Sequence, residues 1–209
     1  MGRLAAKLYD RMTRRMERAG MASERAELLR DLSGRVLEIG AGTGRNLDHY
    51  PATVARLVLA EPDRHMRRGL EARVAVAQRR CGQVSVIDAG AEYLPFPDAT
   101  FDAVVSTLVL CSVEDPGAAA AEIRRVLKPG GVLRAIEHVA STDEAAVRWQ
   151  HRMEPVWRRL AGNCHLTRNT AQTLAGAGLD VAGLRTGVIP TAPSRFAAAV
   201  YGEAVRPQE

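Results

Sequence analysis

The chain has 209 residues, a length typical of one compact domain. Apolar residues make up 46% and charged residues 25%, which excludes collagen-like, intrinsically disordered and disulfide-stapled chains. The net charge of +5 comes from 29 basic and 24 acidic residues spread along the sequence, and only 4% of the residues are aromatic. We therefore expect no nucleic-acid partner, because the arginines do not cluster beyond pairs and aromatic stacking platforms are scarce.

Two helices are predicted before the first strand. Leu4, Leu8, Met12 and Met16 repeat every four residues with arginines among them, which predicts an amphipathic helix with a basic face. A second helix is expected over residues 22–32. The basic face of the first helix is suited to weak peripheral contact with an anionic membrane.

From Arg35 onward, strand patterns alternate with helix patterns. Pro116 opens one helix, which ends before Pro129-Gly130-Gly131. Such alternation predicts an α/β fold, with a mostly parallel sheet covered by helices on both faces. A polar loop over residues 163–168 and two late strands, near Val181 and Phe196, complete the chain. The predicted strands are residues 35–39, 57–60, 84–88, 103–106 and 132–137, and the predicted helices are 63–78, 116–127, 143–160 and 169–177.

Cysteine usage and hydropathy indicate a cytoplasmic protein. The three cysteines, Cys81, Cys111 and Cys164, are far apart and form no Cys-x-x-Cys pair, so no metal site is expected. Cys111 and Cys164 are interpreted as small core residues rather than nucleophiles. No stretch reaches the roughly 18 apolar residues that a membrane span needs, and charged residues interrupt the start of the chain.

A glycine-rich loop after the first strand marks a ligand site. The run Glu38-Ile39-Gly40-Ala41-Gly42-Thr43-Gly44 differs from the G-x-G-x-x-G dinucleotide fingerprint, and no Gly-Lys-Ser/Thr follows to make a P-loop. A carboxylate two residues before the first glycine would repel a pyrophosphate and suits a cationic ligand, which argues against a nicotinamide oxidoreductase. A helix is expected directly after the loop, in a strand, turn and helix order over residues 36–48.

Glu61 closes the second predicted strand at about the spacing from the loop that is expected of a ribose-binding acid. A carboxylate there can accept both ribose hydroxyl groups. The alternative is a capping acid for the helix that starts near Asp63. The glycine loop upstream favours the ribose interpretation.

These motifs resemble the class I S-adenosylmethionine-dependent methyltransferases, particularly the small-molecule group that includes the quinone-biosynthesis enzymes. The resemblance covers residues 35–139. It includes Ala91-Glu92-Tyr93-Leu94-Pro95-Phe96-Pro97-Asp98, which looks like the family's A-E-x-L-P-F-P-D, and residues 125–131, which match R-V-L-K-P-G-G. The family usually has Asp where this chain has Gly90, and Asp88 is the candidate substitute for its contact to adenine.

The resemblance implies a fold and a cofactor. The fold is a Rossmann-like, seven-stranded, mostly parallel sheet with helices on both faces and the last strand antiparallel. Residues 1–209 then form a single domain, with a helical lid (1–33), a cofactor-binding core (34–140) and a substrate-side segment (141–209). The cofactor is S-adenosylmethionine, and the residues implied to bind it are Glu38, Gly40, Ala41, Gly42, Thr43, Gly44, Asn46, Glu61, Pro62, Gly90, Ala91, Glu92, Thr107 and Leu108.

Three further segments resemble a narrower group, the alkyl-thiol S-methyltransferases. They are residues 107–113, 137–140 and 164–168. This similarity implies a small, fairly apolar acceptor, most readily a thiol. Two alternatives stay open: another small-molecule N-, O- or C-methyltransferase, such as a phospholipid N-methyltransferase, and a protein that binds the cofactor without turning it over.

Three residues are candidates for catalysis. His138 ends the fifth predicted strand, at the ligand edge of a parallel sheet, and could accept a thiol proton. A hydrogen-bonded structural histidine is the alternative. Tyr9 could close over the substrate or simply pack against the core. His165 lies in the polar loop, where a role in folding the loop competes with catalysis.

Overall fold

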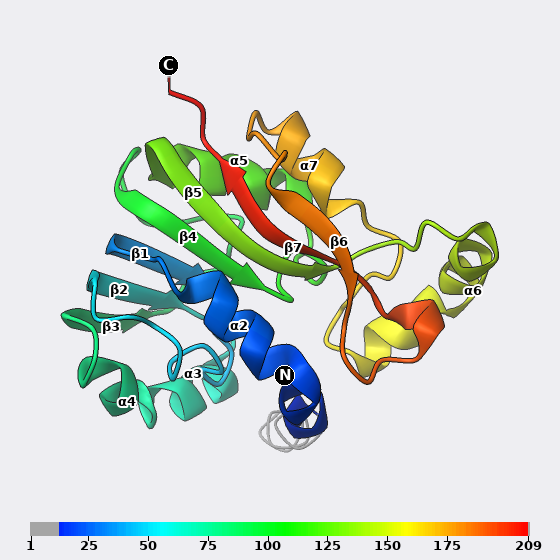
Figure 1. The fold of residues 1–209 in the computed structure, drawn as a ribbon, viewed down its shortest axis with the longest axis horizontal. Coiled ribbons are helices and arrows are strands. Elements are labelled where there is room, and N and C mark those ends of the chain that lie inside the picture. The colour runs from blue at the N-terminus through cyan, green and yellow to red at the C-terminus, as the bar shows by residue number, and fades with distance from the viewer. Residues whose placement is uncertain (1–12, 209) are drawn as a thin grey trace.

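The computed structural model describes residues 13–208 of the chain. Within these residues, seven strands form one sheet in the order β3-β2-β1-β4-β5-β7-β6 (Figure 1). Strands β1 to β5 are parallel to one another, whereas β7 is antiparallel to both β5 and β6. The strands are β1 Gly34–Ile39, β2 Val54–Ala60, β3 Gln83–Ile87, β4 Phe101–Thr107, β5 Leu127–His138, β6 Leu184–Val188 and β7 Ala198–Val205.

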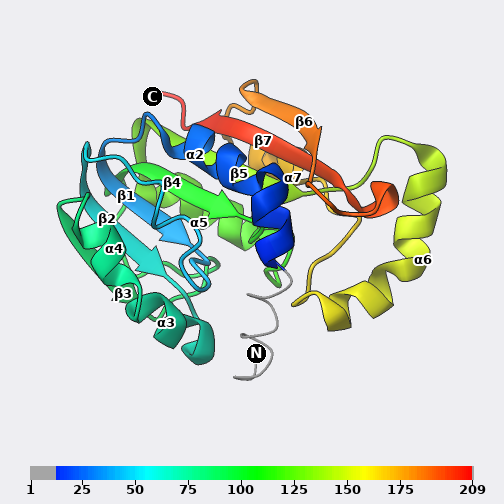
Figure 2. The ribbon, with the colours of Figure 1, turned by 60° about the horizontal axis from the view of Figure 1, so that its bottom comes forward.

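Helices cover both faces of the sheet and enclose two apolar cores. The helices are η1 Glu17–Met21, α2 Ala22–Leu29, α3 Arg64–Glu71, α4 Val74–Gln78, α5 Pro116–Val126, α6 Glu144–Leu160, α7 Thr170–Gly176 and η2 Ser194–Phe196. Leu29 of α2 and Leu70 of α3 pack in one core, whereas Ile123 of α5 and Leu174 of α7 pack in the other. Helix α6 lies beyond the strands, next to η2 (Figure 2). The predicted doubly covered, mostly parallel sheet is confirmed.

The N-terminal helices meet at Gly20. Gly20 has a φ of +131°, inside a π-helical turn between residues 17 and 21. This backbone conformation favours glycine, so the chain can bend there before α2 starts. The predicted Leu4–Leu8–Met12 stripe and Tyr9 lie outside the described residues. Within residues 13–208, no helix is both long and apolar enough to cross a bilayer.

The predicted helix over residues 63–78 is wrong in one respect, because the structure divides it into α3 and α4. The break is at Arg73, whose side chain donates hydrogen bonds to the carbonyl oxygens of Thr43 (3.2 Å) and Gly44 (2.8 Å) and pairs with Asp48 at 2.9 Å. These contacts fasten the break to the glycine loop, a region that is distant in sequence.

Two further expectations need correction. The residues after the glycine loop form successive turns instead of a regular helix, since Leu47 and His49 donate to carbonyl groups three residues back. The late strands begin after Val181 and Phe196 rather than around them. Phe196 belongs to η2, where its N–H donates to the carbonyl of Pro193 at 2.7 Å.

Candidate functional site

The carboxyl ends of β1, β2, β4 and β5 meet at one edge of the sheet, where open α/β sheets bind ligands. The glycine loop leaves β1 at this edge. Gly40 has a φ of +55°, and a Cβ there would lie 2.6 Å from Cγ2 of Val109, so a larger residue is excluded on both grounds. Gly42 has a φ of +58°, and no side chain would lie within 4 Å of a Cβ built on it. The loop therefore leaves its backbone open at the second glycine.

Glu38 lies at the end of β1, beneath the glycine loop, and is 2% exposed. Its carboxylate accepts hydrogen bonds from the hydroxyl of Tyr50 at 2.6 Å and from the side-chain amide of Asn46 at 2.9 Å. Burial raises the pKa of Glu38 from 4.5 to about 7, although both hydrogen bonds and the charge of Arg25 act to lower it. This carboxyl group therefore changes its charge near neutral pH.

Arg25 of α2 is a buried cation that sequence reasoning missed. It is 4% exposed, and its Nη1 donates to Oδ1 of Asn46 at 2.8 Å and to Oγ1 of Thr107 at 2.9 Å. Its Nε lies 3.3 Å from the carboxylate of Glu17. One side chain thus connects the N-terminal helices to the glycine loop and to the end of β4.

Glu61, the first residue after β2, binds two backbone groups. Its carboxylate accepts the N–H of Gly42 at 2.7 Å and the N–H of Asp63 at 2.8 Å. Burial raises the pKa of Glu61, against the effect of these two bonds. The capping role for α3 belongs to Asp63, which accepts from the N–H groups of His65 and Met66. The alternative interpretation of Glu61 as the capping residue of α3 is therefore not supported, because Asp63 caps this helix.

The loop after β3 carries the residues that the resemblance assigns to adenine. Gly90 and Glu92 are partly buried, and the carboxylate of Glu92 accepts the N–H of Glu114 at 2.9 Å. Asp88 instead pairs with Arg67 at 2.7 Å and is 68% exposed at its side chain. Of the remaining assigned residues, Ala41, Thr43 and Ala91 are buried, whereas Pro62 is exposed.

The end of β4 has an unusual backbone conformation. Leu108 has a φ of +62°, which non-glycine residues rarely adopt, and its N–H donates to the carbonyl of Ile136 at 2.8 Å. Such conformations cost about 1–3 kcal/mol and concentrate at functional sites. Thr107, the preceding residue, is within the Arg25–Asn46 network.

Glu137 of β5, a second residue that sequence reasoning missed, holds this backbone in place. It is fully buried and accepts hydrogen bonds from the Ser106 hydroxyl (2.6 Å), the Val109 N–H (3.0 Å) and the Cys111 N–H (3.1 Å). Burial raises the pKa of Glu137, while these donors lower it. The carboxyl group therefore ties β5 to the loop after β4.

His138 is buried, and both of its ring nitrogens contact protein groups. Nε2 lies 2.5 Å from the carbonyl oxygen of Phe196, and Nδ1 lies 3.3 Å from Sγ of Cys164. Cys111, from the loop after β4, interacts with the same sulfur atom. The structure thus brings together one histidine and two cysteines that the sequence left apart.

His165 takes part in folding its own loop. Its Nδ1 lies 3.2 Å from the carboxylate of Glu154, which also accepts the N–H and the hydroxyl of Thr167. Burial and the nearby Arg168 lower the pKa of His165. Arg168 donates to the carbonyl groups of Leu110 and Val113, each at 2.6 Å. These contacts support the loop-folding interpretation of His165.

An aromatic cluster lies where α6 meets η2. Phe196 stacks on Trp157, with ring centroids 4.6 Å apart, and meets Trp149 edge-on at 4.3 Å. The guanidinium of Arg195 lies 5.7 Å from the centre of the Trp149 ring. Leu160, at the end of α6, is 75% exposed and adds nothing to this cluster.

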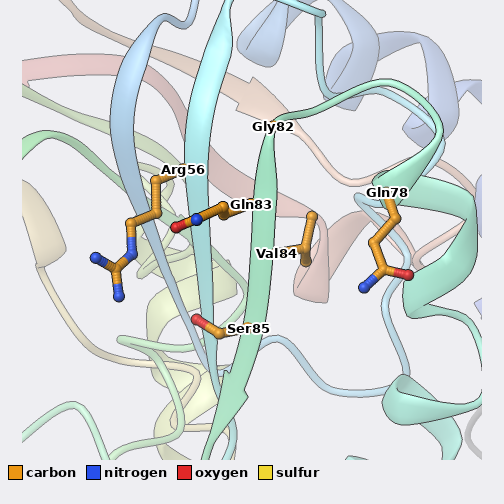
Figure 3. Close-up of a pocket in the computed structure, with 6 residues that line it drawn as sticks. All are labelled: Arg56, Gln78, Gly82, Gln83, Val84 and Ser85. Atoms are coloured by element: carbon orange, nitrogen blue, oxygen red, sulfur yellow. The ribbon is translucent and has the colours of Figure 1, made fainter.

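A pocket of about 490 Å³ lies away from this edge, at the amino end of the outer strand β3. Figure 3 shows Val84 and Gln78 on one side of β3, and Arg56, Gln83 and Ser85 on the other. The pocket therefore wraps around the sheet border and contains no part of the glycine loop. It is not a candidate for the ligand site.

Comparisons with known proteins agree with this geometry. The methyltransferase domain family matches residues 37–135. The thiol S-methyltransferase TMT1B of Homo sapiens is 36% identical over 183 residues, which cover 83% of this chain and 72% of that protein. The thiol S-methyltransferase TMT1A of Homo sapiens is 32% identical over 195 residues, covering 89% and 80%. The structure of geranyl diphosphate methyltransferase in complex with SAM is 14% identical in sequence and has a TM-score of 0.65. The match covers 90% of this chain and 85% of that chain.

The chain therefore belongs to the methyltransferase domain family and is a class I S-adenosylmethionine-dependent methyltransferase. Within that family it is similar to the thiol S-methyltransferases. The family resemblance and the fold predicted from the sequence are confirmed. The roles of the individual site residues stay predictions.

Proposed function

We propose that this methyltransferase transfers the methyl group of S-adenosylmethionine to a small, fairly apolar thiol. The observation that carries the proposal is the similarity to proteins named thiol S-methyltransferases, over 83% of this chain for TMT1B. Segments 107–113, 137–140 and 164–168 carry the same resemblance, and in the fold they lie together at the ends of β4 and β5. Trp149, Trp157 and Phe196 supply apolar surface beside them.

The residues at the glycine loop fit the cofactor. Glu61 offers a carboxylate for the ribose hydroxyl groups, and the open backbone at Gly42 allows a ligand to approach closely. Glu38 holds Asn46 beside the loop and places a negative charge near the cationic methionine end. When bound, the cofactor supplies a methyl group on a sulfonium for in-line displacement, so orientation of the acceptor is the main task of this chain.

The charge of Glu38 predicts a pH-dependent affinity for the cofactor. A carboxyl group whose pKa is raised on folding favours the folded state at low pH, and this contribution is lost as the pH rises through the folded-state pKa, about 7. A cationic ligand favours ionised Glu38, so affinity should rise by up to about tenfold per pH unit towards that pKa and then level off. Isothermal titration at several pH values measures this dependence.

Glu38→Gln is the matched variant, because it keeps the shape of the side chain and cannot ionise. We expect its affinity to be lower than wild type at neutral pH and above, with the rise below neutral pH removed. Titration of the ligand itself affects both proteins equally, so it cancels when the affinity of the variant is compared with that of wild type at each pH. Parallel pH curves for the two proteins would contradict the role of Glu38.

An acceptor screen tests the thiol assignment. Thiols, phenols, amines and phosphatidylethanolamine vesicles are each incubated with the enzyme and cofactor, and the release of S-adenosylhomocysteine is measured. We expect release with apolar thiols. Release with another acceptor class alone would overturn the assignment, and the absence of release with every class would favour a protein that binds the cofactor without turnover.

Phosphatidylethanolamine is included because of one surface feature. Arg14, Arg15 and Arg18 are exposed on the N-terminal helix, a charge pattern suited to an anionic membrane. A lipid amine is therefore the second candidate acceptor. Methylation of vesicles that contain anionic lipid, with none for free thiols, would select it.

His138 is proposed as the base that deprotonates the acceptor thiol. This role requires the acceptor sulfur to take the place that Sγ of Cys164 occupies beside Nδ1. We expect His138→Ala to lower the rate of thiol methylation at least about tenfold at pH 7, with a smaller loss at high pH where the thiol ionises unaided. An unchanged rate and pH profile would make His138 a structural residue. The closing role predicted for Tyr9 stays a prediction.

A further inference from the structure

Two cysteines from separate loops meet beside β5. Cys111 follows β4, and Cys164 lies between α6 and α7. Two hydrogen bonds join the loops, from the residues directly before and after Cys164. The His165 N–H donates to the Cys111 carbonyl at 2.8 Å, and the Asn163 side chain donates to the Ser112 carbonyl at 2.9 Å. The thiols of Cys111 and Cys164 interact with each other. The hydrogen bonds between the two loops therefore hold Cys111 and Cys164 next to each other.

His138 faces this pair with a defined protonation pattern. The carbonyl oxygen of Phe196 can only accept, so Nε2 of His138 must carry the hydrogen of their 2.5 Å bond. In the neutral ring, Nδ1 then presents its lone pair to Sγ of Cys164 at 3.3 Å. Nδ1 is thus placed to accept the proton of the Cys164 thiol, the arrangement that activates a sulfur nucleophile.

The two sulfur atoms differ in exposure and acidity. Cys111 is 1% exposed, whereas Cys164 is partly exposed and can meet a small molecule first. The contact with Cys111, together with that with His138, lowers the pKa of Cys164 against the effect of its burial, whereas the contact with Cys164 and burial raise the pKa of Cys111. In thiol–disulfide exchange, the more acidic and exposed thiol attacks as a thiolate and forms a mixed disulfide. A buried thiol beside it can then displace the bound group.

We propose that Cys164 and Cys111 form a dithiol centre that reduces small-molecule disulfides by thiol–disulfide exchange, with Cys164 as the attacking residue and Cys111 as the resolving residue. In the first step, the Cys164 thiolate forms a bond to one sulfur of a disulfide RSSR, the S–S bond breaks, and RS⁻ leaves. In the second step, Cys111 loses its proton and its thiolate attacks Sγ of Cys164, the Cys164–SR bond breaks, and the second RS⁻ leaves. The protein ends with a Cys111–Cys164 disulfide, two electrons pass to RSSR, and two RS groups are released as thiols.

The centre adds a property to the methyltransferase that does not depend on the identity of the methyl acceptor. The exchange uses neither the glycine loop nor the cofactor, so it can be measured in the absence of S-adenosylmethionine. Its product joins the loop after β4, which Glu137 holds through Cys111, to the loop that Arg168 fastens in place. Oxidation therefore locks the two loops together.

The test uses the full chain, fully reduced and freed of reductant, with bis(2-hydroxyethyl) disulfide as the probe. We expect two thiols to be released per wild-type chain, the loss of the mass of two hydrogens, and one cross-linked peptide pair that contains Cys111 and Cys164. A cross-link that involves Cys81, or no cross-link with an excess of probe, would overturn the proposal. This peptide map needs no variant and so does not depend on the folding of a mutant.

Three variants assign the roles. Cys111→Ser should release one thiol per chain and retain the probe as a mixed disulfide on Cys164. Cys164→Ser should react at least about tenfold more slowly, because the activated sulfur is gone. Cys81→Ser is the matched control, since Cys81 lies elsewhere, with Sγ 3.9 Å from the Pro51 carbonyl, and it should behave as wild type. A Cys164→Ser variant that reacts as fast as wild type would refute the assignment, whether or not thiols prove to be the methyl acceptors.

Discussion

Replacing Glu61 with alanine is expected to lower the affinity for S-adenosylmethionine at least tenfold, on the order of 1.4 kcal/mol. The carboxylate accepts the N–H of Gly42 at 2.7 Å and that of Asp63 at 2.8 Å, so it orients the glycine loop as well as offering an acceptor to the ribose. Alanine removes both functions. Isothermal titration of the cofactor into wild type and variant measures the loss.

Two controls separate the contributions to this effect. Glu71→Ala removes an exposed carboxylate from the end of the neighbouring α3, and its affinity should match wild type. Glu61→Gln keeps one acceptor oxygen but loses the charge, and we expect an intermediate affinity. Equal affinity for wild type and Glu61→Ala would remove Glu61 from the cofactor site, and measurable binding of NADH without binding of S-adenosylmethionine would remove the cofactor assignment itself.

Glu137→Ala is expected to lower the free energy of unfolding by about 3 kcal/mol or more, because it leaves two buried donors and one partly buried donor without an acceptor, at about 1–3 kcal/mol each. The donors are the hydroxyl of Ser106 and the N–H groups of Val109 and Cys111. The cavity left by the side chain adds to the loss. Urea denaturation followed by circular dichroism gives the change.

Glu144→Ala serves as the control for this measurement, since its side chain is 94% exposed on α6 and should change stability little. Glu137→Gln tests whether both carboxylate oxygens are needed as acceptors. The glutamine amide has a single acceptor oxygen, and its NH₂ group would face one of the donors. We expect it to be destabilising as well. A stability of Glu137→Ala within about 0.5 kcal/mol of wild type, the usual range for surface substitutions, would mean that the loop reorganises without cost.

The sequence predicted the parts of the fold that depend on local pattern. The apolar run before Gly40 and the alternation of strands and helices indicate a parallel sheet, and the structure has it. The break at Arg73 could not be predicted, because its partners are carbonyl groups of Thr43 and Gly44, and backbone carbonyls leave no mark in a sequence. The start of β7 was predicted too early, near Phe196, because the short helix η2 that precedes the strand gives no periodic signal in the sequence.

The same distinction applies to the candidate site. Glu38 and Glu61 could be predicted as site residues because a glycine loop and a strand end mark their positions, whereas Arg25 was overlooked as one basic residue among many. Its signal was its position on the inner face of α2, next to the buried Leu28 and Leu29. The meeting of His138 with Cys164 depends on how the loop after α6 folds back, which long-range contacts such as that of Arg168 determine.

Helix α6 has a consequence for how this enzyme could diversify. Within this fully described helix, only Ala146 and Gln150 are buried among seventeen residues, and among the helices and strands its main packing partner is η2. Substitutions on its exposed positions therefore carry little folding penalty, while the strands and the glycine loop tolerate few changes. Evolution or a laboratory library can vary the aromatic surface around Trp149 and Trp157 and leave the cofactor machinery intact.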